Sequence, residues 1–156
     1  MNEIRVFKMT KEGKEVMEKQ EKKMVFVSDP KGIYQDHFVV VRSDFLIVKK
    51  YFMPSMLSYD FPWDKIQSIS FCAQCDDEKS KVRGKGLDDE GRWWAVDVLR
   101  DQERDLHLYN VRIEADAEPP KSGFTVEDIE HFFHACRPFL PYSCTIRYDN
   151  GRTEEE

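Results

Sequence analysis

A single amphipathic helix after a long series of strand-like segments is the feature that most constrains this fold. Residues 124–137 read Phe-Thr-Val-Glu-Asp-Ile-Glu-His-Phe-Phe-His-Ala-Cys-Arg. At about 100° per residue, the apolar side chains gather on one stripe: Val126, Ile129, Phe133 and Cys136, with Phe132 on its shoulder. Such a stripe must pack against another element, and a sheet or the mouth of a barrel is the available partner. We therefore expect the helix to be a lid over a β core.

Residues at both ends of this segment predict where the helix begins and stops. Thr125 is placed to cap the first turn, with Asp128 at capping-box spacing, and Phe124 and Ile129 occupy the positions of a hydrophobic staple. Pro138 opposes continuation, because the residue before a proline avoids helical backbone angles.

The residues before the helix are rich in short apolar runs separated by polar turns. Candidate strands lie at 37–42, 45–52, 56–61, 65–72, 79–86, 92–99 and 104–113, after a first run at 24–28. In the 65–72 run, Ile69 and Phe71 share one face, as in a half-buried strand. The connections are short, as antiparallel connections usually are, whereas 114–123 reads as a polar connection into the helix. We predict a mainly β (α+β) fold of roughly seven antiparallel strands closed by one C-terminal helix.

The length of 156 residues suits one domain. Residues 1–23 are dominated by charge and are interpreted as a short helix or an arm, and residues 24–140 form the expected domain. The tail, 141–156, is expected to add an edge strand at 142–147 and then to be disordered.

Charge and composition exclude several classes of function. Acidic residues outnumber basic ones by 30 to 24, a formal charge of −6, which disfavours general binding to nucleic acid or to an anionic membrane surface. No apolar stretch approaches the roughly 20 residues that span a membrane, and the N-terminus lacks the apolar core of a signal peptide. We expect a cytoplasmic protein whose four cysteines are thiols.

Two cysteines and two histidines invite a zinc interpretation. Cys72 and Cys75 form a Cys-x-x-Cys pair, and His131 and His134 lie on the predicted helix. The histidines point away from the apolar stripe, however, and about 55 residues separate the two pairs, beyond the spacing of a compact zinc finger. We therefore expect solvent-facing histidines and no metal or other cofactor. A redox role is also disfavoured, since the acidic residues that follow Cys75 would raise the thiol pKa.

Basic side chains alternate through residues 79–85 and would share one face of a strand. With two neighbouring lysines they would form an anion site; the candidate residues are Lys49, Lys50, Lys79, Lys81, Arg83 and Lys85. The alternative is a solvated hairpin whose charges balance the adjacent acidic runs. Trp93 and Trp94 begin a strand and point to opposite faces, so we expect one in the core and the other on the surface or under the helix. An exposed tryptophan would be a candidate anchor for a partner.

The chain has no recognisable catalytic motif: it lacks a nucleophile elbow, a phosphate-binding loop and a His-Glu-x-x-His pair. We predict that the protein is not an enzyme. Residues 51–57 place several apolar groups around a proline, as either a packed corner, which we favour, or a small interaction patch.

The order of elements resembles the pleckstrin-homology-like (PH-like) superfold, especially its small bacterial members. Three segments carry the resemblance: 38–49, similar to the paired strands that begin such domains; 59–69, similar to a strand, a short turn and an Ile-x-x-Ile strand; and 124–138, similar to the terminal helix. The resemblance covers approximately residues 24–140 and implies a seven-stranded, strongly bent barrel, usually without catalysis, that binds lipids, peptides or proteins. The charged N-terminal segment and the acidic balance depart from it.

The resulting functional prediction is a non-enzymatic interaction module. It would bind a protein or peptide, or self-associate, along a strand edge or in a groove beside the helix. The alternative is a binder of an anionic small molecule or lipid head group that uses the basic face at 79–85. An enzyme with a carboxylate-rich cleft is a third hypothesis, and nothing in the sequence requires it.

Overall fold

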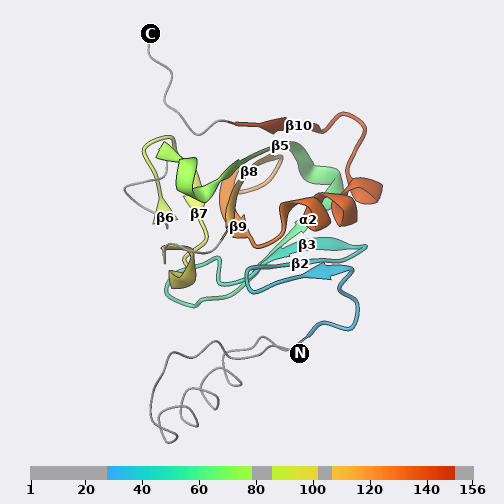
Figure 1. The fold of residues 1–156 in the computed structure, drawn as a ribbon, viewed down its shortest axis with the longest axis horizontal. Helices are drawn as coiled ribbons and strands as arrows, with labels where there is room; N and C mark the ends of the chain where they lie inside the picture. Colours follow the sequence, from blue (N-terminus) through green and yellow to red (C-terminus); the bar gives the residue numbers. More distant parts are fainter. Residues whose placement is uncertain (1–27, 79–85, 102–106, 150–156) are drawn as a thin grey trace, which may run out of the picture.

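The computed structural model describes residues 28–78, 86–101 and 107–149, which fold into a mainly β structure with one α-helix (Figure 1). The strands are β1 (Tyr34–Gln35), β2 (Val39–Val41), β3 (Phe45–Val48), β4 (Tyr59–Pro62), β5 (Ile66–Ala73), β6 (Gly86–Leu87), β7 (Trp93–Trp94), β8 (Tyr109–Ala115), β9 (Lys121–Val126) and β10 (Thr145–Tyr148). The helix is α2 (Ile129–Cys136), and short 3₁₀ helices span Trp63–Lys65, Gln74–Asp76, Val98–Asp101 and Arg137–Phe139.

The strands form two sheets. The smaller has the order β1-β2-β3-β4, and all its pairs are antiparallel. The larger has the order β10-β5-β8-β9-β7-β6, in which β5, β8 and β9 form a continuous antiparallel centre. The predicted mainly β class is therefore confirmed.

Two details of the predicted architecture are wrong within the described residues. The strands are divided between two sheets and do not close into the barrel that the resemblance implied. The sheets are also not wholly antiparallel, because β10 pairs with β5 and β7 pairs with β9 in the parallel direction. Parallel pairs join strands across long connections, whereas the short loops of the sequence had suggested only hairpins.

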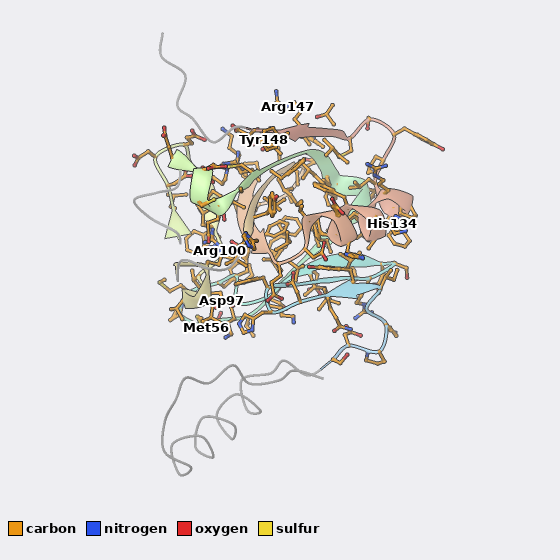
Figure 2. All side chains as sticks on the ribbon, in the orientation of Figure 1. Met56, Asp97, Arg100, His134, Arg147 and Tyr148 are labelled. Atoms are coloured by element: carbon orange, nitrogen blue, oxygen red, sulfur yellow. The ribbon has the colours of Figure 1, made fainter. Side chains whose placement is uncertain are left out.

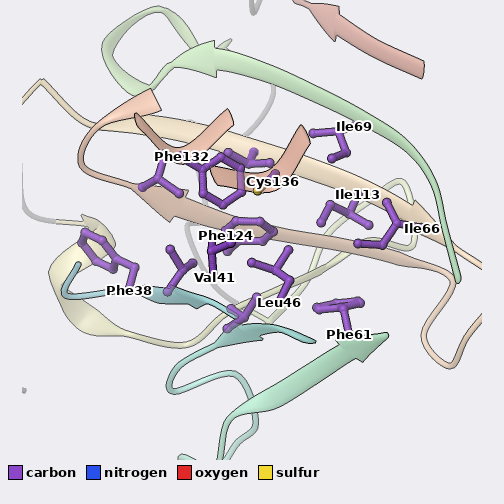
Figure 3. Packing of buried hydrophobic residues seen from close by; sticks show 14 of the residues in the cluster. Phe38, Val41, Leu46, Phe61, Ile66, Ile69, Ile113, Phe124, Phe132 and Cys136 are labelled. Atoms are coloured by element: carbon purple, nitrogen blue, oxygen red, sulfur yellow. The ribbon is translucent and has the colours of Figure 1, made fainter. Parts of the chain in front are cut away.

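The hydrophobic core lies between the two sheets (Figure 3). The alternating side chains Val111, Ile113 and Ala115 of β8 enter it, while Asn110 and Arg112 point to the other face of the same sheet. From the smaller sheet, Val41, Leu46 and Phe61 close the core opposite them. Because every second side chain of a strand points to the same face, the apolar residues at these positions fill the core.

Helix α2 lies between the two sheets and inserts its apolar side into this core (Figure 1). Phe132, Phe133, Ala135 and Cys136 are buried, as the amphipathic pattern predicted. The predicted start of the helix is wrong: Asp128, not Thr125, is the N-cap, and its Oδ1 accepts a hydrogen bond from the His131 amide (3.1 Å).

The reason is strand β9, which the sequence analysis missed. Thr125 is opposite Asn110 of β8, so its backbone belongs to the sheet and is not available to begin a helix. Phe124 likewise enters the core from β9, and the hydrophobic staple expected for it does not form at the helix start. The segment 121–126 was interpreted as loop and helix because two prolines precede it and a cap-like Thr-x-x-Asp pattern overlaps it.

The strand expected at 142–147 is present as β10, at one edge of the larger sheet. The interpretations of residues 1–23, of the strand at 24–28 except Ser28, and of the tail end at 153–156 lie outside the described residues. No helix among the described residues is long and apolar enough to cross a membrane.

Candidate functional site

Strand β10 is the most exposed strand of the structure. All four of its residues are exposed, and Figure 2 shows Arg147 and Tyr148 along it, at the top of the view. Its sequence, Thr-Ile-Arg-Tyr, is rich in residues that favour strands and contains neither proline nor glycine. It is the last strand of the larger sheet, so in the described part of the chain one of its sides has no neighbouring strand.

The hydrogen bonds to β5 reveal which backbone groups of β10 remain open. Asp149 donates its amide to the Phe71 carbonyl (2.8 Å), and Tyr148 is the register partner of Phe71. Because backbone polar groups alternate along a strand, Arg147 and Asp149 face β5, whereas Ile146 and Tyr148 direct their N–H and C=O groups away from it. The edge therefore presents two donor–acceptor pairs for a further strand.

The side chains of β10 divide between the two faces of the sheet. Ile146 and Tyr148 are in register with Ile69 and Phe71 and lie on the core side, where the Tyr148 ring contacts Phe71 (centroids 5.6 Å apart). They are 39% and 62% exposed, so the apolar inner face continues past the covered core to the edge. Arg147 lies on the opposite face, in register with Ser70.

Lys49 and Lys50, predicted to help bind an anion, adjoin the smaller sheet beside carboxylates. Lys49 Nζ donates to the Asp36 carbonyl oxygen (2.7 Å). Burial lowers the Lys49 pKa, while the negative charges of Asp36, Glu127 and Asp97 act in the opposite direction. Lys50 is exposed, with a positive φ of 47°. Lys49 is thus surrounded by acidic groups that compete with an added anion.

The remaining basic candidates, Lys79, Lys81, Arg83 and Lys85, lie outside the described residues, so the proposed basic face stays a prediction.

The two tryptophans do point to opposite faces, and neither is a fully exposed anchor. Trp93 packs partly buried against the hydrophobic core, and its indole N–H donates to the Tyr51 carbonyl (2.8 Å). Trp94 is fully buried on the other face of the sheet, and its indole N–H donates to Asp88 Oδ2 (2.8 Å). One tryptophan thus packs against the core, as expected, whereas Trp94, on the opposite face, is fully buried and is not a surface anchor.

Trp94 is the centre of a buried polar cluster that the sequence analysis did not foresee. The guanidinium carbons of Arg100 and Arg112 lie 4.7 and 4.9 Å from the ring centroid, within the range of cation–π attraction. The ring also lies against Gly123 of β9, where a Cβ atom would be only 2.4 Å from the ring carbon Cε3. A Cβ atom at this position would overlap the indole ring unless one of the two shifted.

An ion pair and hydrogen bonds partly compensate the charges of this cluster. Arg112 Nη2 donates to Asp77 Oδ1 (3.0 Å), Arg112 Nη1 lies 2.9 Å from Asp77 Oδ2, and Asp77 Oδ2 also accepts from Asn110 Nδ2 (2.8 Å). Arg100 Nε donates to Thr125 Oγ1 (2.7 Å). Asp77 is 4% exposed, although it lies in an acidic stretch between two predicted strands. Removing either member of the buried Arg112–Asp77 pair would leave an uncompensated buried charge, so the two residues depend on each other.

Cys72 lies next to this cluster and is buried. Burial, followed by the negative charge of Asp77, raises the pKa of its thiol to about 12, which agrees with the expectation that it is not a reactive thiolate. His131 and His134 are exposed on α2, as predicted. No group of three or more candidate metal ligands is present among the described residues.

The loop at 51–57 is an exposed apolar surface, contrary to the packed corner that we favoured. Tyr51 alone is buried and hydrogen-bonds Ser122 through its hydroxyl group (2.6 Å). Four other side chains are 36–65% exposed: Phe52, Met53, Met56 and Leu57. Met56 has a φ of 60°, in the left-handed region that glycine favours.

No family model matches this chain, no curated protein matches it, and no solved structure matches it.

Proposed function

We propose that this protein is a non-enzymatic interaction module that binds an extended protein segment by strand addition at the open edge of β10. The observation that carries the proposal is the row of outward backbone groups at Ile146 and Tyr148, in a strand that, among the described residues, pairs with β5 alone. Main-chain hydrogen bonds supply the affinity in strand addition, so little side-chain sequence signature is required of the receiving edge.

The other sheet edges in the described structure are less suited to this role. Strands β1 and β6 are two residues long, and β4 ends in Pro62, which has no N–H to donate. Strand β10 is four residues long and retains its N–H groups, so it is the better template.

The faces of β10 would contribute the specificity. Ile146 and Tyr148 offer apolar contacts to alternate side chains of an added strand, next to the partly buried Phe71. Arg147 on the opposite face favours an acidic side chain across from it. The preferred partner is thus an extended segment with alternating apolar and acidic residues.

A PH-like architecture remains part of this proposal. The mainly β fold and the C-terminal helix that packs into the core support it. The resemblance implies a binding module, and strand addition at the β10 edge is one such mode of binding.

A proline substitution tests the edge directly. Ile146→Pro removes an outward N–H and leaves the hydrogen bonds to β5, whereas Ile146→Thr retains the N–H and strand propensity with a similar loss of apolar surface. Peptides selected from a displayed library of random 10-residue sequences would serve as the probe, with titration followed by NMR of backbone amides.

We expect selected peptides to shift the amide signals of Ile146 and Tyr148, and to bind Ile146→Pro at least tenfold more weakly than Ile146→Thr. Peptides that shift signals only elsewhere, or that bind both variants equally, would refute the proposal.

A further inference from the structure

The geometry of β10 points to a specific occupant of its edge, and we infer that a second copy of this chain pairs with it. The two β10 strands would run antiparallel about a two-fold axis, joining two six-stranded sheets edge to edge. This inference rests on the proposed function, since it identifies the added strand as β10 of another molecule.

The outward backbone groups restrict the register of such a pair. Residues that exchange hydrogen bonds across the axis must be those whose N–H and C=O groups face outward, namely Ile146 and Tyr148. A two-fold axis then permits three arrangements of these residues: Ile146 opposite Tyr148, Ile146 opposite itself, or Tyr148 opposite itself.

Charge distinguishes the three registers. With Ile146 opposite Tyr148, Arg147 faces the partner's Arg147 at the close, non-hydrogen-bonded position, where like charges repel. With Ile146 opposite itself, Arg147 faces Thr145 and no charges are paired. With Tyr148 opposite itself, Arg147 of each copy faces Asp149 of the other, which makes two opposite-charge pairs.

The placement of both side chains supports the third register. Arg147 and Asp149 are two residues apart, so they share the face of the sheet opposite the core. The Asp149 carboxylate lies close enough to Cys72, on that same face, to contribute to the raised pKa of the thiol. On the core face, the two Tyr148 rings would meet beside Phe71 and cover apolar surface that is 62% exposed in one copy.

Charge reversal tests the register with little risk to the fold, because the altered side chains belong to an edge strand whose backbone bonds remain. Arg147→Asp places two aspartates opposite each other at both ends of the pair, and Asp149→Arg places two arginines there. Each single variant is expected to weaken dimerisation by about tenfold or more. The double variant, Arg147→Asp with Asp149→Arg, restores both opposite-charge pairs and should recover dimerisation.

Mixing the two single variants is the decisive experiment. A copy with Asp at 147 and 149 and a copy with Arg at both positions are complementary at both pairs, so the mixture should form heterodimers that neither variant forms alone. Sedimentation velocity of the full chain at ~100 µM, suited to a small interface of weak affinity, distinguishes the 18.5 kDa monomer from a dimer. Thermal melts followed by circular dichroism establish that each variant is folded.

Each outcome separates this inference from the proposed function. If the wild-type chain dimerises, charge reversal weakens the dimer, and mixing the two single variants restores it, both this inference and the proposed function are supported. A dimer that is insensitive to charge reversal overturns the register, and a monomeric wild-type chain that still binds selected peptides at β10 overturns self-pairing while leaving the proposed function intact. A monomer that binds no peptide at this edge contradicts both.

Discussion

The contact between Gly123 and Trp94 allows a prediction in which two effects oppose each other. Replacing glycine by alanine at a position whose backbone angles alanine can adopt stabilises a protein by about 0.4–1 kcal/mol. The reason is that alanine reduces the conformational entropy of the unfolded chain. Gly123 has no positive φ to forbid the change. Backbone considerations alone therefore predict that Gly123→Ala increases the free energy of unfolding.

The packing predicts the reverse. The added Cβ atom would lie 2.4, 2.5 and 2.6 Å from three carbons of the indole ring, about 1 Å closer than ordinary contact. The ring cannot easily move away, because it is fully buried, donates a hydrogen bond to Asp88 and is in cation–π contact with Arg100 and Arg112. Overpacking of this kind costs typically about 1–3 kcal/mol.

The packing term is the larger one, so Gly123→Ala should lower the free energy of unfolding by about 1–2 kcal/mol. The corresponding decrease in Tm is about 2–8 °C for a chain of this size. Urea unfolding followed by far-ultraviolet circular dichroism would measure it.

A double-mutant cycle with Trp94→Leu provides the control. Once the ring is removed, Gly123→Ala should cost much less, or become stabilising, so the two substitutions should be strongly coupled. A stabilising Gly123→Ala in the wild-type background, or a cost that is the same with and without Trp94, would show that the close contact does not govern this position.

Three further predictions concern buried ionisable groups. Asp77→Asn should destabilise the protein by about 3–5 kcal/mol in urea unfolding, because it leaves Arg112 buried without its charged partner. Burial raises the pKa of Asp97, but the contact with His37, whose Nε2 lies 3.3 Å from Asp97 Oδ2, and the hydrogen bond from the Leu99 amide outweigh this and lower the pKa overall. Asp97 therefore contributes stability that is fully present above its unfolded pKa of about 3.9 and is lost as the pH falls through its lower folded value. Finally, Cys72 should react with a disulfide reagent at pH 8 at least a hundredfold more slowly in the native than in the unfolded state, because burial raises its pKa to about 12.

Matched controls distinguish these three specific effects from a general loss of stability. Asp76→Asn alters an exposed neighbour of Asp77 and should change stability by no more than about 0.5 kcal/mol. For Asp97, the difference in stability between wild type and Asp97→Asn should shrink below about pH 4; a constant difference would contradict the assignment. The exposed Cys75 should be modified rapidly in the native state, and equal rates for both thiols would argue against burial of Cys72.

The amino-acid sequence by itself determined the fold class and the location of most strands. Alternating apolar residues in 65–72, runs of β-branched residues in 37–42 and 45–52, and the edge strand in the tail all appear as strands. The stripe containing Phe133 and Cys136 correctly predicted the buried side of the helix. These properties follow from local periodicity, since a side chain's position along a strand or helix decides which face it occupies.

Features that depend on contacts between distant segments were determined only by the tertiary structure. The pattern around Thr125 is equally compatible with a helix cap and with a strand, and pairing with Asn110 of β8 selected the strand. The burial of Asp77 depends on Arg112, 35 residues away, so no local pattern could distinguish it from a solvated acidic turn.

The candidate site at β10 was likewise predictable only in part from the sequence. The tail was foreseen as an edge strand, but its parallel pairing with β5, and hence the direction in which Ile146 and Tyr148 present their backbone groups, exists only in the folded sheet. Hydrogen bonding between strands is set by which segments meet in space, and this chain brings together segments about 75 residues apart to create that edge.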